Sequence, residues 1–255
     1  MSKLLVNNHL LVDNLKLVIF DKDGTLIDIH HYWVSMIRLR SELIIKKWFG
    51  LKDPDRHKLN LMSLMGVDLK TQKLKQNGPV GVKPREFIVA IVSKYVSENS
   101  TIVSREEIEL IFKDVDKISE KNLLPFLKLL PGVEEIINQM HRKGVIMTIA
   151  STDITSRVKK AMHHLNLEAF FSNIIGGDLV KKTKPHPDLA LKILRESNID
   201  AENTVVIGDH PVDILMAESA NIEFSIGVLN GISKVENFNQ YNCQLVDSLH
   251  SLKIV

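Results

Sequence analysis

The chain has 255 residues, of which 44% are hydrophobic and 25% are charged. This composition is typical of a globular protein with one large domain or two smaller ones. A net charge of +2, with no long basic run, argues against nucleic acid and anionic membranes as partners. The lone cysteine, Cys243, excludes an internal disulfide and a cysteine zinc cluster. No signal-peptide pattern is visible, and no apolar run approaches the roughly 20 residues that span a bilayer, so we expect a cytoplasmic protein.

The first structural signal in chain order is a short apolar run, Leu15–Phe20. Its length and its β-forming residues predict a fully buried strand. The next segment, residues 30–129, predicts helices and no strong strand, because its apolar residues repeat at helical spacing. These residues are Trp33, Met36, Ile37, Ile44 and Trp48; Phe87, Ile88, Ile91 and Tyr95; and Ile108, Phe112 and Val115.

From Leu130 onward the pattern alternates between helix and strand. A helix is expected after Pro131 and Gly132, then a strand at Val145–Ala150 and a helix around Val158 and Met162. Further strands are predicted at Asn173–Ile175, Thr204–Ile207 and Phe224–Val228, with a helix starting at Pro187. This order predicts an α/β fold with a parallel sheet and helices on both faces. We expect residues 1–28 and 130–255 to form this core, and residues 29–129 to form an inserted helical domain.

Polar residues follow the predicted strands, and in parallel sheets ligands bind beyond the carboxyl ends of the strands. Four segments supply these residues: Asp21, Asp23, Gly24 and Thr25; Ser151, Thr152 and Asp153; Lys184; and Gly208, Asp209 and Asp213. Each segment alone is a weak signal. Their order and their placement near strand ends predict one site that combines carboxylates, a hydroxyl and an amine.

The paired aspartates indicate the chemistry of this site. Residues i and i+2 of an extended chain point to the same side, so Asp21 and Asp23 should share a face, with Lys22 turned away. A divalent cation would relieve the repulsion between carboxylates, and an oxygen-rich shell completed by Asp209 and Asp213 suits Mg²⁺. One carboxylate could then attack phosphorus while Asp23 transfers protons. Gly24 should allow a tight turn with amide groups free to face an anion.

Four stretches of the sequence resemble the motifs of the haloacid dehalogenase superfamily. They are DKDGT at Asp21, the hydroxyl residues after the second predicted strand, KPHPD at Lys184 and GDHPVD at Gly208. The branch that the chain resembles contains phosphoglycolate phosphatase and β-phosphoglucomutase, with a helical cap between the first and second motifs. The resemblance implies a Rossmann-like core.

This resemblance also implies roles for individual residues. Asp21 would be the nucleophile that becomes aspartyl-phosphate, and Asp23 the general acid and base. Ser151 would bind phosphate, Lys184 would be the motif lysine, and Asp209 would bind Mg²⁺. The Asp21 carboxylate and the Asp23 backbone carbonyl would be further metal ligands. Asp213 would bind the metal through water or support the site from behind.

Plainer interpretations stand beside these assignments. Asp28 could cap the first helix of the insert, Asp213 could be a helix cap, and Lys184 could belong to a solvated charge run with Lys181 and Lys182. Ser151 and Thr152 could both be capping hydroxyls. In the insert, Lys83 and Arg85 could reach an anionic substrate or form an ordinary solvated pair.

Together these patterns predict a Mg²⁺-dependent phosphatase that acts on a small phosphorylated metabolite. A phosphomutase of the β-phosphoglucomutase type is the alternative within enzymes, and a non-catalytic binding protein on the same fold is the alternative outside them. Asp23 argues against halide displacement and phosphonate cleavage, because family members with those activities depart from the pattern at this position. The sequence assigns neither a particular substrate nor an oligomeric state.

Overall fold

The computed structural model describes residues 2–75, 78–80 and 83–255. The chain divides into two compact units, one formed by Met1–Ile29 with Leu127–Val255 and the other by His30–Phe126.

A six-stranded parallel sheet forms the centre of the first unit, with the strand order β10-β9-β8-β3-β6-β7. The strands are β3 (Leu17–Phe20), β6 (Ile146–Ala150), β7 (Asn173–Ile175), β8 (Thr204–Gly208), β9 (Phe224–Val228) and β10 (Gln244–Val246). Strand β3 lies between β6 and β8, and all four of its residues are buried. The predicted α/β class with a parallel sheet is confirmed.

Helices connect these strands and cover the sheet. They are α5 (Val133–Arg142), α6 (Thr155–His164), α7 (Asp188–Ser197), α8 (Pro211–Ser219) and the short α9 (Val235–Phe238). From β3 the chain adds β6 and β7 on one side of the sheet, and it then crosses to the other side of β3 to add β8, β9 and β10. Because the crossovers are right-handed, this change of direction places α7 and α8 on the face opposite to α5 and α6. In this arrangement the carboxyl ends of β3, β6 and β8 meet at one edge.

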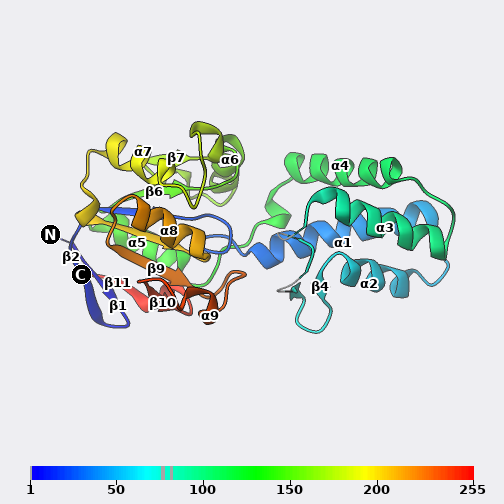
Figure 1. The fold of residues 1–255 in the computed structure, drawn as a ribbon, viewed down its shortest axis with the longest axis horizontal. Coiled ribbons are helices and arrows are strands. Elements are labelled where there is room, and N and C mark those ends of the chain that lie inside the picture. The colour runs from blue at the N-terminus through cyan, green and yellow to red at the C-terminus, as the bar shows by residue number, and fades with distance from the viewer. Residues whose placement is uncertain (1, 76–77, 81–82) are drawn as a thin grey trace. The chain divides into compact units, whose positions relative to one another are not determined.

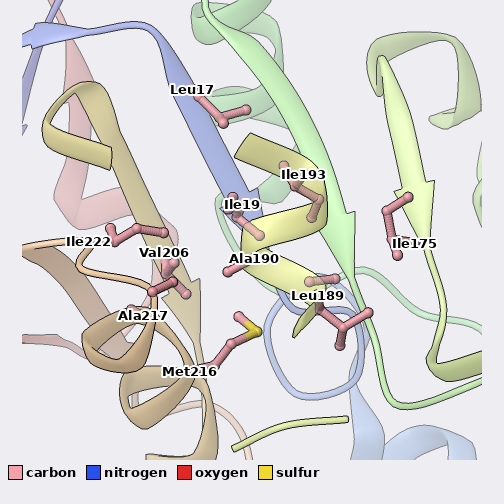
Figure 2. Close-up of a cluster of buried hydrophobic side chains, with 12 residues drawn as sticks. Leu17, Ile19, Ile175, Leu189, Ala190, Ile193, Val206, Met216, Ala217 and Ile222 are labelled. Carbon is pink, nitrogen blue, oxygen red and sulfur yellow. The ribbon is translucent and has the colours of Figure 1, made fainter. Parts of the chain in front are cut away.

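A cluster of buried apolar side chains joins the sheet to α7 and α8. Figure 2 shows Ala190 and Ile193 of α7 beside Ile19 of β3, with Met216 and Ala217 of α8 adjoining them. Side chains alternate between the two faces of a strand, so Val18 and Phe20 of β3 point to the other face. Burial on both faces explains why β3 is apolar throughout.

A three-stranded antiparallel sheet that the sequence patterns did not predict joins the two ends of the chain, in the order β11-β1-β2. Its strands are β1 (Ser2–Val6), β2 (His9–Leu15) and β11 (Leu252–Ile254). Asn7 and Asn8, which both have positive φ, form the turn between β1 and β2. Lys16 separates β2 from β3, so the predicted strand at Leu15–Phe20 is in fact the end of one strand and the whole of another.

The second unit is mainly helical (Figure 1). It contains α1 (Ile29–Trp48, beginning one residue before the unit), α2 (Pro54–Leu64), α3 (Arg85–Asn99) and α4 (Arg105–Lys121). Besides these helices, Val67–Asp68 (β4) and Lys73–Leu74 (β5) form a short antiparallel pair of two residues each. Among the residues that the structure describes, none of the helices combines the length and hydrophobicity needed to cross a bilayer.

Candidate active site

Several predicted site residues of the first unit directly follow strands of the parallel sheet. Asp21 directly follows β3, Ser151 directly follows β6, and Asp209 directly follows β8. Backbone hydrogen bonds fix these junctions, since the Asp21 amide donates to the Ile207 carbonyl at 2.8 Å and the Ser151 amide donates to Ile175 at 3.0 Å. The strand register therefore brings segments that are far apart in sequence to one edge.

Lys184 joins two of these segments. Its Nζ lies 2.6 Å from Oδ1 of Asp21 and 2.6 Å from Oδ1 of Asp213, and its side chain is 2% exposed. Burial lowers the pKa of Lys184, but the two carboxylates outweigh burial, and the pKa ends above its ordinary value. Lys184 is therefore a fixed positive charge next to Asp21, and the alternative of a solvated charge run is wrong.

Three acidic side chains gather beside this lysine. Asp21, Asp209 and Asp213 each offer a carboxylate oxygen, and these oxygens all lie within 4.8 Å of one another. Burial is the largest cause that raises the pKa of Asp21, and burial together with the Asp21 charge raises the pKa of Asp209 well above its usual range. One lysine cannot balance three carboxylates.

This donor set fits a divalent cation. Hard carboxylate oxygens are the ligands that Mg²⁺ prefers, and a cation among them would relieve the repulsion that raises the pKa values. Asp213 is committed in part to other contacts, because its Oδ2 accepts the His210 amide at 3.1 Å and caps the start of α8. Its other oxygen pairs with Lys184, so Asp213 combines the capping interpretation with a place in the acidic group.

Asp23 is held by a different lysine. Nζ of Lys22 lies 3.0 Å from Oδ2 of Asp23 and 2.8 Å from Oδ2 of Asp153. The expectation that Lys22 is turned away from the aspartates is therefore wrong, because the tight turn after β3 lets its side chain fold back toward Asp23. Burial raises the pKa of Asp23, and the Lys22 ammonium opposes the rise without cancelling it. The Asp23 carboxylate is not part of the acidic group around Asp209.

The role expected for the amide of Gly24 also needs correction. This amide donates to the Ile27 carbonyl at 2.8 Å, so it is not free to face an anion. Gly24 has a φ of +92°, and a Cβ at this position would collide with the Asp209 carboxylate. Glycine is thus required here for close approach to Asp209. Thr25 is fully buried, and its hydroxyl has no hydrogen-bond partner among the described residues.

The two hydroxyl residues after β6 differ in their surroundings. Ser151 is 2% exposed, and its Oγ accepts the Asp153 amide at 3.1 Å. Thr152 is exposed. The serine therefore lies in a fixed position inside the turn after β6.

The loop after β9 contributes contacts that the sequence patterns missed. The Ile232 amide donates to Oδ2 of Asp209 at 3.2 Å, and a Cβ on Gly231 would collide with the same carboxylate. The available signal was the strand Phe224–Val228 followed shortly by Asn230 and Gly231, since residues after a parallel strand belong to the ligand-binding edge.

In the helical unit, Arg85 is already paired. Its guanidinium bonds to Glu109 and Asp116, with Nη1 2.6 Å from Oδ2 of Asp116. The ammonium of Lys83 lies 5.9 Å from the centre of the Phe87 ring.

Asp28 belongs to the first unit, and its Oδ2 lies 4.0 Å from Nζ of Lys128.

Comparison with known proteins assigns the class. Residues 15–221 match the family model of haloacid dehalogenase-like hydrolases, and the chain belongs to this family. The predicted enzyme class, a hydrolase of the phosphatase type, is confirmed by this family and by relatives named as phosphatases.

Two of the curated relatives illustrate the activities found in this family. A phosphorylated carbohydrates phosphatase of Thermotoga maritima is 26% identical over 219 residues, covering 86% of this chain and 88% of the relative. A phosphoglycolate phosphatase of Colwellia psychrerythraea is 30% identical over 149 residues, covering 57% of this chain and 66% of the relative. Among solved structures, a β-phosphoglucomutase of Clostridium difficile matches with a TM-score of 0.56 at 21% identity, covering 92% of both chains, which shows the shared fold.

Proposed function

We propose that this chain is a Mg²⁺-dependent phosphomonoesterase that acts on a small phosphorylated metabolite through an aspartyl-phosphate. The observation that carries the proposal is the buried Lys184 held against Asp21 within the acidic group. The names of the phosphatase relatives support the substrate class. We also propose that the helical unit His30–Phe126 is the cap domain of this enzyme.

In the first half of the proposed reaction, a carboxylate oxygen of Asp21 forms a bond to phosphorus. The bond between phosphorus and the alcohol oxygen breaks, and that oxygen takes the proton carried by Asp23. The raised pKa of Asp23 favours a carboxyl group that can carry this proton closer to neutral pH. Lys184 sits where negative charge gathers, and Ser151 is the proposed hydroxyl donor to a phosphate oxygen.

In the second half, Asp23 accepts a proton from water, and the water oxygen attacks phosphorus. The acyl-phosphate bond breaks, which releases inorganic phosphate and restores the Asp21 carboxylate. Asp21, Asp209 and Asp213 would hold the cation, with the backbone carbonyl of Asp23 as a further proposed ligand. When bound, Mg²⁺ would supply positive charge that keeps these carboxylates ionised and close together. We propose that the buried Thr25 and the exposed Thr152 help to bind the phosphate group of the substrate.

The proposal is tested by hydrolysis of p-nitrophenyl phosphate with and without Mg²⁺. We expect wild-type protein to release phosphate only when the cation is present, and to do so even when no sugar bisphosphate is added. A phosphomutase would need a bisphosphate to turn over. Asp21→Asn should be inactive, while Asp247→Asn, which changes an exposed carboxylate elsewhere, should be unaffected. Activity in Asp21→Asn, or equal inertness of wild type and variant with every divalent metal, would refute the proposal.

A further inference from the structure

Lys22, which occupies the position between the two aspartates, is almost fully enclosed. It is 5% exposed, and its ammonium pairs with carboxylates on two different loops, those of Asp23 and Asp153. Asp23 belongs to the turn after β3, and Asp153 belongs to the turn after β6. A buried ammonium is costly unless carboxylates pair with it, so this position demands a partner on each side.

Asp153 is itself firmly anchored. Its Oδ1 accepts from Nη1 of Arg157 at 3.0 Å and from the Ile154 amide at 2.8 Å, which leaves Oδ2 for Lys22 at 2.8 Å. Its backbone amide bonds to Ser151. Asp153 is thus fixed by α6 and by the turn that carries the proposed phosphate-binding serine.

Asp23 is the most exposed of the three residues that are linked by Lys22. Its side chain is 37% exposed, compared with 16% for Asp153 and 7% for Lys22. A partly exposed aspartate can rotate between several conformers, and general acid catalysis requires the proton to lie within hydrogen-bond reach of the leaving oxygen. The contact to Lys22 restricts this rotation from the buried side.

We propose that Lys22 is a positioning residue: braced by Asp153, it holds the Asp23 carboxyl group in the orientation from which its proton reaches the leaving alcohol. This inference rests on the proposed phosphatase reaction. It extends that reaction by giving a role to the middle residue of DKDGT and to an aspartate outside the predicted catalytic set. The step that Lys22 assists is the one in which the departing alcohol oxygen takes the proton of Asp23.

The test exploits the leaving group, since proton donation matters most when the departing alcohol is a poor leaving group. In Lys22→Met, kcat/KM for a simple alkyl phosphate should fall at least about tenfold, a fraction of the whole general-acid effect, while p-nitrophenyl phosphate should lose less than about threefold. Lys22→Arg should recover part of the loss, because it restores a cation between the carboxylates. Asp153→Asn should show the same pattern in weaker form.

Controls separate this role from a merely structural one. Lys159→Met removes an exposed lysine from α6 and should leave kcat/KM unchanged for both substrates. Adding Lys22→Met to Asp23→Asn should cause no further loss, because the group being positioned is already unable to donate a proton. Circular dichroism checks folding. If Lys22→Met does not fold, the activities on the two substrates are compared in Lys22→Gln and Asp153→Asn instead.

Two results would overturn the inference while leaving the phosphatase proposal intact. One is an equal loss on both substrates in Lys22→Met. The other is an additional loss when Lys22→Met is placed in the Asp23→Asn background. Persistent activity in Asp21→Asn would instead refute the proposed function itself, so the two failures are distinguishable.

Discussion

Asp209→Asn should make the metal-free protein more stable, although it removes a proposed metal ligand. The carboxylate oxygens of Asp21, Asp209 and Asp213 lie within 4.8 Å of one another, and two unit charges at that distance repel by about 3 kcal/mol at an effective dielectric constant of about 20. Lys184 offsets part of this repulsion. We therefore expect a net gain of about 2 kcal/mol, or roughly 5 °C in melting temperature for a chain of this size. The asparagine oxygen can still accept the Ile232 amide.

The assay is thermal unfolding followed by circular dichroism at neutral pH, first in a chelator and then with excess Mg²⁺. Wild type should melt below Asp209→Asn in the chelator and should gain stability with Mg²⁺, because a ligand that binds the folded state stabilises it. The variant should gain much less. Asp247→Asn serves as the matched control and should follow wild type in both conditions. If Asp209→Asn melted below wild type in the chelator, the reasoning about crowded carboxylates would be wrong.

Three further predictions follow from the same structure. Because folding raises the pKa of Asp209 above 3.8, the stability of the metal-free wild type should fall as the pH rises from about 4 through the raised pKa. The difference in melting temperature between wild type and Asp209→Asn should therefore shrink as the pH is lowered toward 4. A difference that does not depend on pH would contradict this reasoning. Gly231→Ala should weaken Mg²⁺ binding about tenfold or more by isothermal titration calorimetry, because its Cβ would displace the Asp209 carboxylate, and unchanged binding would show that this loop is not part of the site. In the helical unit, Asp116→Ala should cost about 3 kcal/mol in urea unfolding, because it removes the carboxylate that pairs with Arg85 and with Arg40, which is 4% exposed. Asp114→Ala on the same helix should cost less than about 0.5 kcal/mol, and equal costs would refute this reasoning.

The parallel sheet could be predicted because its strands are short apolar runs with clear boundaries. Asn173–Ile175 and Phe224–Val228 were predicted with the bounds that the structure shows, and Thr204–Ile207 is one residue short. The terminal antiparallel sheet was missed because β2 and β3 are separated only by Lys16 and because β11 pairs with a strand almost the whole chain away. Local patterns carry no information about such distant pairing.

The sequence by itself determined the class of fold, because the short apolar runs that mark its strands are local properties. It also predicted Asp21, Asp23, Lys184 and Asp209 as site residues, because they stand in recognisable motifs. Only the tertiary structure decided which carboxylates share a lysine. It placed Lys184 between Asp21 and Asp213, turned Lys22 back to Asp23 and Asp153, and used the Gly24 amide within its own turn. The physical reason is that ion pairing and close approach depend on the distances between loops that only the assembled sheet brings together.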